Sequence, residues 1–329
     1  MKPATALALL ALGIASIAAG AALQPENTAP IASTAQPVLP GIAGQLETAA
    51  RVELHQGAKT STLVRLDGKW GLAEREQYPV TVSKVRALFS GLGELRQIER
   101  RSSDATSWAR LGVEDPAPPS STATSLRVLD EQGKVLADII LGHRTTATKG
   151  DLPDHLYIRR PGDTQSWLAE GHLDVSADPQ SWLLRDIVNI GHDSIARVVV
   201  QRGEDTFDFR RNGEAFALSN PPSGKLDDDR IAAMAGALEL VSQSDVRRGP
   251  LPGMPFGNAV FTTTSGLSLI VTVNRDGKSV WASFAAHGPG EDEYQRLSGW
   301  AFELPEWRAT SLIPAKSDLL ATADETAPK

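Results

Sequence analysis

The sequence of 329 residues contains no cysteine, few aromatic residues and no concentration of basic charge. Without cysteine, disulfides, thiolate metal sites and a lipid-modified amino-terminal cysteine are excluded. The formal net charge of -7 and the lack of a stripe of Lys and Arg argue against a nucleic-acid surface. A chain of this length has room for one large or two medium domains with hydrophobic cores, so it does not need disulfides for stability.

Familiar catalytic and metal-binding motifs are also missing. No pair of histidines has the spacing of a zinc-binding helix; the six are His55, His143, His155, His172, His192 and His287. The serines at 265, 268 and 279 lack the turn of a hydrolase nucleophile, and residues 142–149 lack the spacing of a phosphate-binding loop. The run 227–229 of three aspartates does not alternate as a calcium loop does, and it suits the start of a helix. We therefore expect no catalytic residue, no metal site and no cofactor.

One long apolar run covers residues 4–23, and Lys2 is the only basic residue before Arg51. Twenty helical residues span about 30 Å, which is enough to cross the hydrocarbon core of a membrane. The placement of positive charge then leaves the amino terminus in the cytoplasm and exports the rest of the chain. We expect a retained anchor, with cleavage near the small residues Ala19, Gly20 and Ala21 as the alternative.

Residues 24–45 follow as a linker rich in Pro, Ala, Ser and Thr. Its prolines, at positions 25, 30, 37 and 40, favour an extended spacer between the membrane and the folded body. The sequence thus predicts an exported body held on the extracytoplasmic, or periplasmic, face of the cytoplasmic membrane.

The body repeats a pattern. Alternating residues, a turn at Asp67-Gly68 or Asn212-Gly213 and a strand with Trp70 or Phe216 predict a hairpin in each half. An apolar stripe at helical spacing follows in each half, with the matched positions 146 residues apart: Val85, Leu88, Leu92 and Leu95 against Ile231, Met234, Leu238 and Val241. Thr81 and Asp227 are the expected N-caps. A constant offset of this size indicates a duplicated domain.

Further strands are predicted after each helix, at residues 125–129, 135–141, 155–159 and 166–168, and at 258–263, 267–273 and 280–285. The predicted fold class is α+β, internally duplicated, with two halves rich in antiparallel sheet. The predicted divisions are an anchor at 1–23, the linker at 24–45, a first repeat at 46–178, a connecting helix at 179–193, a second repeat at 194–314 and a flexible tail at 315–329.

Seven tryptophans occupy positions 70, 108, 167, 182, 281, 300 and 307. Most are expected to pack in the core, since tryptophan buries a large area and suits strands. Trp300 and Trp307, near the end of the body, are the better candidates for an exposed contact with a partner, although burial is the favoured expectation for them as well.

Several short segments resemble the family called domain of unknown function 4340. They are Val38-Leu39-Pro40-Gly41-Ile42, Trp70-Gly71-Leu72, Tyr78-Pro79, Leu111-Gly112-Val113, Ile140-Leu141-Gly142 and residues 299–305. The resemblance covers nearly the whole chain after the linker. It implies a membrane-anchored extracytoplasmic protein associated with ABC-type transport components of the gliding-motility type, and it supplies no family catalytic residues.

The expected function is therefore a non-enzymatic, membrane-tethered scaffold or accessory protein. An envelope-polymer or ligand-binding module is the alternative, and it requires a groove between the halves lined by exposed tryptophan. A hydrolase comes third, because it requires a serine or aspartate beside a histidine whose ring a carboxylate orients.

Overall fold

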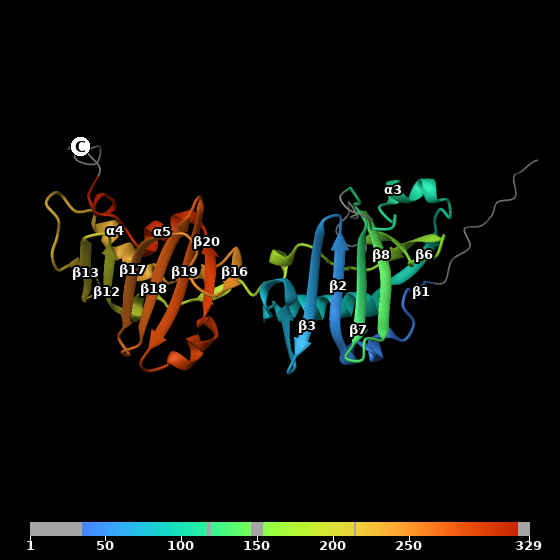
Figure 1. Ribbon diagram of the computed structural model, residues 1–329, viewed down its shortest axis with the longest axis horizontal. Helices are drawn as coiled ribbons and strands as arrows, with labels where there is room; N and C mark the ends of the chain where they lie inside the picture. Colours follow the sequence, from blue (N-terminus) through green and yellow to red (C-terminus); the bar gives the residue numbers. More distant parts are fainter. Residues whose placement is uncertain (1–34, 117–119, 146–153, 214, 322–329) are drawn as a thin grey trace, which may run out of the picture.

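The computed structural model describes residues 35–116, 120–145, 154–213 and 215–321. These residues form two lobes that lie side by side, each built on one antiparallel sheet (Figure 1). The first sheet has the order β1-β6-β10-β9-β8-β7-β2-β3-β4-β5. Its strands are β1 (Gln36–Pro37), β2 (Ala49–Gln56), β3 (Lys59–Leu66), β4 (Lys69–Leu72), β5 (Tyr78–Pro79), β6 (Arg96–Arg100), β7 (Thr124–Asp130), β8 (Val135–Thr145), β9 (His155–Arg159) and β10 (Ser166–Glu170).

The second sheet has the order β14-β13-β12-β17-β18-β19-β20-β16. Its strands are β12 (Ile195–Arg202), β13 (Asp205–Asn212), β14 (Ala215–Leu218), β16 (Asp245–Arg248), β17 (Met254–Thr263), β18 (Ser268–Asp276), β19 (Ser279–His287) and β20 (Trp300–Leu304). A separate pair joins β11 (Asp186–Val188) to β15 (Val241–Ser242). The seven strands predicted after the helices correspond to β7, β8, β9, β10, β17, β18 and β19.

The second sheet repeats the strand order of the first. Read from β6 to β4, the first sheet runs β6-β10-β9-β8-β7-β2-β3-β4, and the second runs β16-β20-β19-β18-β17-β12-β13-β14. The matched aromatic residues also have equivalent neighbours. The Arg65 guanidinium lies 5.9 Å from the Trp70 ring, and the Arg211 guanidinium lies 5.0 Å from the Phe216 ring.

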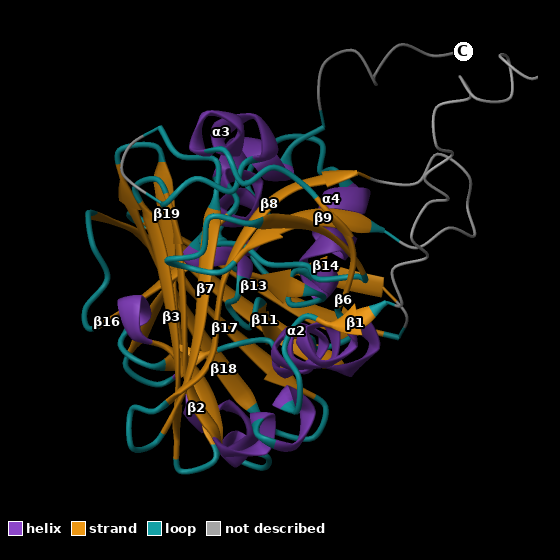
Figure 2. Ribbon diagram, turned by 90° about the vertical axis from the view of Figure 1, so that its right-hand side faces the viewer, coloured by secondary structure: helices purple, strands orange, loops and turns teal. Residues whose placement is uncertain are grey.

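The longest helix, α2 (Val82–Glu94), buries the apolar stripe of the first lobe, including Val85, Leu88 and Leu92. The first sheet curls around α2, and α4 lies on the same side of the molecule as α2 (Figure 2). Thr81 occupies the N-cap of α2, but its hydroxyl donates to the Leu183 carbonyl oxygen instead of capping the helix. The other α-helices are α3 (Trp108–Leu111), α4 (Asp228–Ala233) and α5 (Glu306–Leu312).

Short 3-10 turns complete the described secondary structure: η1 (Ile42–Gly44), η2 (Leu46–Thr48), η3 (Ala73–Arg75), η4 (Ala105–Ser107), η5 (Pro179–Ser181), η6 (His192–Ser194), η7 (Met234–Gly236), η8 (Glu291–Leu297) and η9 (Lys316–Leu319). Several of them connect strands at the edges of the sheets. They do not alter the layer of sheet that defines each lobe.

The predicted α+β class is wrong, because the protein is mostly β, with 45% of the described residues in strands against 23% in helices. The second apolar stripe explains much of the difference. It forms only α4, of 6 residues, before tightening into η7, and Leu240 then takes a left-handed conformation with φ of 47°. Large antiparallel sheets form most of the body, and alternate side chains along their strands are buried on one face.

Three predicted boundaries also need correction. The connecting helix expected at 179–193 contains two 3-10 turns and the strand β11 instead. The linker expected to end at residue 45 includes Val38 and Ile42, which are buried in the core. The tail expected from residue 315 begins with η9, whose Leu319 is also buried.

No helix among the described residues is long and apolar enough to span a membrane. The predicted anchor at residues 4–23 lies outside the described part of the chain, as do residues 322–329 of the predicted tail.

Candidate partner-binding site

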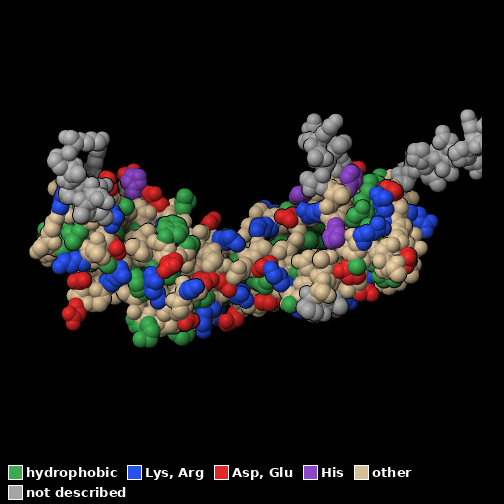
Figure 3. All heavy atoms as spheres, turned by 90° about the horizontal axis from the view of Figure 1, so that it is seen from above, with side chains coloured by type: hydrophobic (Ala, Val, Ile, Leu, Met, Phe, Trp, Pro, Cys, Tyr) green, Lys and Arg blue, Asp and Glu red, His purple; other side chains and the backbone are tan. Residues whose placement is uncertain are grey.

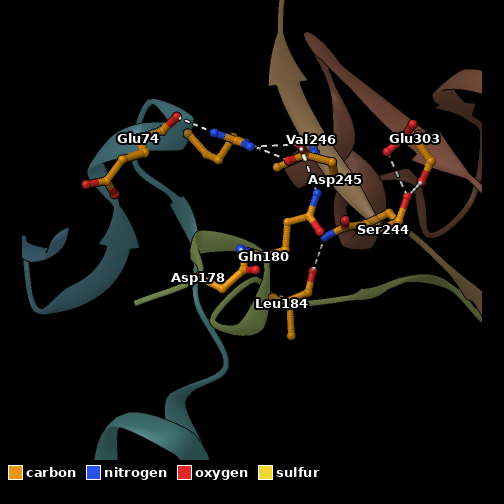
Figure 4. Close-up of polar contacts among 10 residues, drawn as sticks. Glu74, Asp178, Gln180, Leu184, Ser244, Asp245, Val246 and Glu303 are labelled. Atoms are coloured by element: carbon orange, nitrogen blue, oxygen red, sulfur yellow. Dashed lines mark hydrogen bonds and ion pairs between the residues drawn. The ribbon is translucent and has the colours of Figure 1, made fainter. Parts of the chain in front are cut away.

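A polar joint connects the two lobes. Arg75, at the end of η3, donates from Nε and Nη2 to the two carboxylate oxygens of Asp245 on β16, at 2.6 Å and 2.7 Å (Figure 4). Gln180 of η5 donates to the same carboxylate at 3.4 Å. Burial alone would raise the pKa of Asp245, but the hydrogen bonds from Arg75 and from the Val246 amide hold that pKa below its ordinary value. The three elements are thereby tied together at one carboxylate.

An aromatic contact lies beside this ion pair. Tyr78 of β5 is 1% exposed, and its ring lies 5.1 Å from Trp300 and 6.0 Å from Phe302, edge to face in both cases. The first lobe thus inserts a side chain into the core of the second, and one continuous cluster of buried residues spans both lobes. This contact holds the lobes in a defined arrangement. It also occupies the place between the halves where an envelope-polymer module would need an open groove.

A groove of about 620 Å³ lies on the outer part of the second lobe, between α4, η7, α5 and η9. Its floor includes Met234, Ala237 and Leu319, which are almost fully buried. Asp227 caps α4 by accepting a hydrogen bond from the Arg230 amide, so the predicted capping role of the aspartate run is confirmed at that residue. The cap begins the helix that forms one wall of the groove.

The opposite wall carries Trp307, whose side chain is 60% exposed. The Arg308 guanidinium lies 4.2 Å from the centre of the Trp307 ring and donates to the carbonyl oxygens of Ala237 and Leu240. Leu240 itself is 74% exposed. The large apolar side chains of Trp307 and Leu240 are therefore exposed to solvent beside Arg308, whose guanidinium is held by two backbone carbonyl oxygens and the Trp307 ring.

Of the two tryptophans considered as candidates for exposure, one is exposed and the other has the burial that the sequence favours for both. Trp307 is exposed, whereas Trp300 is 8% exposed because Tyr78 covers it. Reasoning from the sequence missed Leu240, whose exposure depends on its left-handed backbone at the end of η7. It also missed the fixed position of Arg308, because the adjacent residues Trp307 and Arg308 form no sequence pattern that indicates these contacts.

The histidines are dispersed over the two lobes. His55 is hydrogen-bonded to Thr60 at 3.0 Å, His172 to Asp154 at 2.9 Å and His192 to Glu239 at 2.8 Å. Within the described residues, no serine hydroxyl is hydrogen-bonded to a histidine ring, and no group of three or more His, Asp or Glu side chains is arranged to hold a metal. Serine and carboxylate therefore do not meet at one histidine in this part of the chain. An aspartate and a second carboxylate do: on the exposed surface, His192 has Asp193 at 3.1 Å from Nε2 and Glu239 at 2.8 Å from Nδ1.

The fold and these surfaces define a two-lobed, mostly β protein with a closed joint and an exposed tryptophan groove. Residues 70–254 match the family described as Domain of unknown function (DUF4340). Because the match covers more than half of the chain, the protein belongs to this family, as the resemblance of its short segments indicated. No curated protein matches the chain. The matched residues begin at β4 of the first lobe and continue through the joint to Met254 of the second.

Proposed function

We propose that the protein is a non-enzymatic interaction protein that binds a partner protein through the Trp307 groove. The exposed pair formed by Trp307 and Arg308 carries this proposal. Tryptophan and arginine dominate the binding energy of many protein interfaces, particularly where they surround a pocket that excludes water. Here the apolar floor supplies the pocket, and Arg230 and Asp318 supply a polar rim.

The chemistry of the groove favours an apolar side chain of a folded partner over a small polar ligand. Trp307, Met234 and Leu319 offer apolar surface, and the Arg308 guanidinium is already engaged with the Trp307 ring and two carbonyl oxygens. A partner that covers Trp307 and Leu240 would remove a large apolar area from water.

The proposal places this body at the extracytoplasmic face of the membrane, tethered by residues 4–23. The apolar run and the proline-rich segment after it support the tether, and the family resemblance supports a partner among ABC-type transport components. Tethering raises the effective concentration of the body beside a membrane complex without any new contact.

The test is complementation of a deletion strain by full-length variants at matched levels. We expect Trp307→Ala to lose most of the rescue, because it removes the aromatic wall and the ring on which Arg308 lies. Leu66→Ala is the matched control, since Leu66 is a large apolar side chain with 53% exposure on the first lobe. Full rescue by Trp307→Ala would overturn the role of the groove.

A second arm separates the tether from the groove. An exported version without the anchor should begin at Ala35, because a start at Gly41 would remove β1 and the buried Val38. We expect this version to fold and to rescue poorly. Equal rescue by the anchored and soluble forms would count against the tethered scaffold and favour an envelope enzyme or ligand-binding module.

A further inference from the structure

The two lobes carry the same arginine and tryptophan pair at equivalent edges. On β6 and β10, Arg100 is paired with Trp167, and its guanidinium lies 5.6 Å from the ring. On β16 and β20, Arg248 is paired with Trp300, at 5.3 Å. β6 and β16 occupy the same place relative to the other shared strands, although β16 is the outermost strand of its sheet and β1 pairs with β6 at Arg96 and Gln97. The Arg100 end of β6, beyond β1, is therefore the counterpart that can be compared.

In the second lobe, this edge is a docking site that is already filled. Tyr78 of the first lobe covers Trp300, and Arg75 of the first lobe pairs with Asp245. The edge therefore receives two contacts. An aromatic ring packs against Trp300, and a charged group pairs with Asp245, the strand partner of Glu303. Burial of Trp300 is the result.

In the first lobe, the end of the counterpart that carries Trp167 is open, whereas β1 covers the end that carries Arg96. Trp167 is only partly buried, and together with Arg100, Gln97 and Gln165 it lines a recess of about 310 Å³. The charge also differs at the position that Asp245 occupies in the second lobe, because an arginine stands there in the first. Asp245 is the strand partner of Glu303, and Arg96 is the strand partner of Glu170 at the equivalent place.

Three arginines at this edge have no carboxylate partner within the described residues. Arg96 donates to the carbonyl oxygens of Gly93 and Leu95, Arg100 to the Gln165 side chain and Arg160 to the Val38 carbonyl oxygen. Asp163 is the one carboxylate that lines the recess. Lys and Arg side chains are visible at this outer end of the first lobe, although the whole chain has a net charge of -7 (Figure 3). The local charge therefore favours an anionic partner.

We propose that the recess beside Trp167 binds an acidic segment of a partner protein that also presents an aromatic side chain. The aromatic ring takes the place that Tyr78 has on Trp300, and a carboxylate meets Arg100 or Arg160, the two arginines that line the recess. The second lobe of another copy of this chain cannot supply these contacts. Its residues at the positions of Arg75 and Tyr78, 146 residues later, are Pro221 and Gly224, which carry neither a charge nor an aromatic ring.

The test measures binding of full-length protein, in neutral detergent, to an immobilised random copolymer of glutamate and tyrosine. Polyglutamate is the comparison that lacks the aromatic group. The negative net charge opposes general adsorption of a polyanion, so binding reports the local patch. We expect the copolymer to bind more tightly than polyglutamate, and we expect the double variant Arg100→Glu, Arg160→Glu to weaken binding by about tenfold or more.

The double variant Lys134→Glu, Lys278→Glu is the charge-matched control, because it makes the same change in net charge at exposed turns outside the recess. It should bind like the unaltered protein. Trp167→Leu should bind both polymers equally, since it removes the aromatic surface and keeps the arginines; its melting temperature verifies that it is folded.

Equal binding by the arginine variant and the unaltered protein would overturn the proposal, and so would a failure of the unaltered protein to bind the copolymer. Soluble short-chain phosphatidylglycerol is added as a competitor in a parallel series. If this lipid binds in an Arg100- and Arg160-dependent way and the copolymer does not, the recess is a lipid-headgroup site and the protein-docking proposal is wrong. Rescue by Trp307→Ala would not affect this result, because the groove and the recess are on different lobes.

Discussion

Replacing Tyr78 with phenylalanine tests the joint directly, because the change removes one hydroxyl and keeps the aromatic ring. That hydroxyl donates to the Leu184 carbonyl oxygen at 3.2 Å, and the side chain is 1% exposed. Burial raises the pKa of Tyr78 from its ordinary value of 10.0 to about 12, against a smaller lowering by the charge of Arg296. The hydroxyl is therefore kept neutral in the folded protein well above the pH at which it ionises in the unfolded chain.

The direction of the pH effect follows from this raised pKa. The folded state holds the proton more tightly, so the stabilisation is fully present below about pH 10 and is lost as the pH rises toward 12. Linkage gives a loss of about 1.4 kcal/mol by pH 11 and at most about 2.7 kcal/mol. At pH 7, Tyr78→Phe should cost about 1 kcal/mol, because it leaves the Leu184 carbonyl oxygen without this donor.

The assay is urea unfolding of the two proteins from pH 7 to pH 11. We expect the unaltered protein to be more stable at pH 7 by about 1 kcal/mol and the two stability curves to meet near pH 11. Other titrating groups are common to both proteins, so they cancel in the difference. Parallel curves over this range would refute the reasoning, because they would show that the Tyr78 hydroxyl is not closed off from water in the joint.

Three other predictions concern the joint and α2. Alanine replacements of Arg75 and Asp245, alone and together, should give a coupling energy of about 1 to 3 kcal/mol in a double-mutant cycle; a value near zero would contradict a joint fixed by this pair. Leu92→Ala should lower the free energy of unfolding by about 2 to 5 kcal/mol, and an unchanged denaturation midpoint would show that the stripe is not core. Gly91→Ala should destabilise the protein by about 1 to 3 kcal/mol, because the added Cβ would lie 2.4 Å from the His172 carbonyl oxygen. Gly93→Ala is the control: its added Cβ would have its nearest neighbour at 3.7 Å, so this variant should unfold at the same urea concentration as the parent or higher.

Local patterns in the sequence predicted the parts of the fold that depend on neighbouring residues. Turn residues such as Asp67 and Gly68 lie between β3 and β4 with positive φ values, which the tight hairpin requires. The periodic stripe from Val85 to Leu92 forms α2 because its apolar side chains face one buried side. The matching stripe of the second half forms only α4 and η7, so the local pattern identifies the buried side but not the length of the helix.

The joint could not be predicted in this way. Arg75 and Asp245 lie 170 residues apart, and each sits in a segment whose local pattern suits an exposed strand or turn. Their meeting depends on how one sheet edge approaches the other. The same approach buries Trp300, and the residues that cover it cannot be identified from its position near the end of the body.

The candidate groove was predictable only in part for a related reason. Trp307 lies near the end of the body, which made it a candidate for exposure, and α5 presents it to solvent. The floor of the groove comes from η7 and η9, which are separated from Trp307 in the chain and meet it only after the lobe has folded. A sequence pattern identifies the anchor residue of such a site more readily than its shape.

Each sheet is made from an uninterrupted stretch of the chain, since β1 to β10 precede every strand of the second sheet. Domains fold as units and the amino-terminal one generally folds first during synthesis. The first lobe therefore has all of its strands available before the second is complete, and it then displays Arg75 and Tyr78 on its edge. The second lobe then meets a preformed surface as its last strands arrive, and we expect the joint to close late in folding.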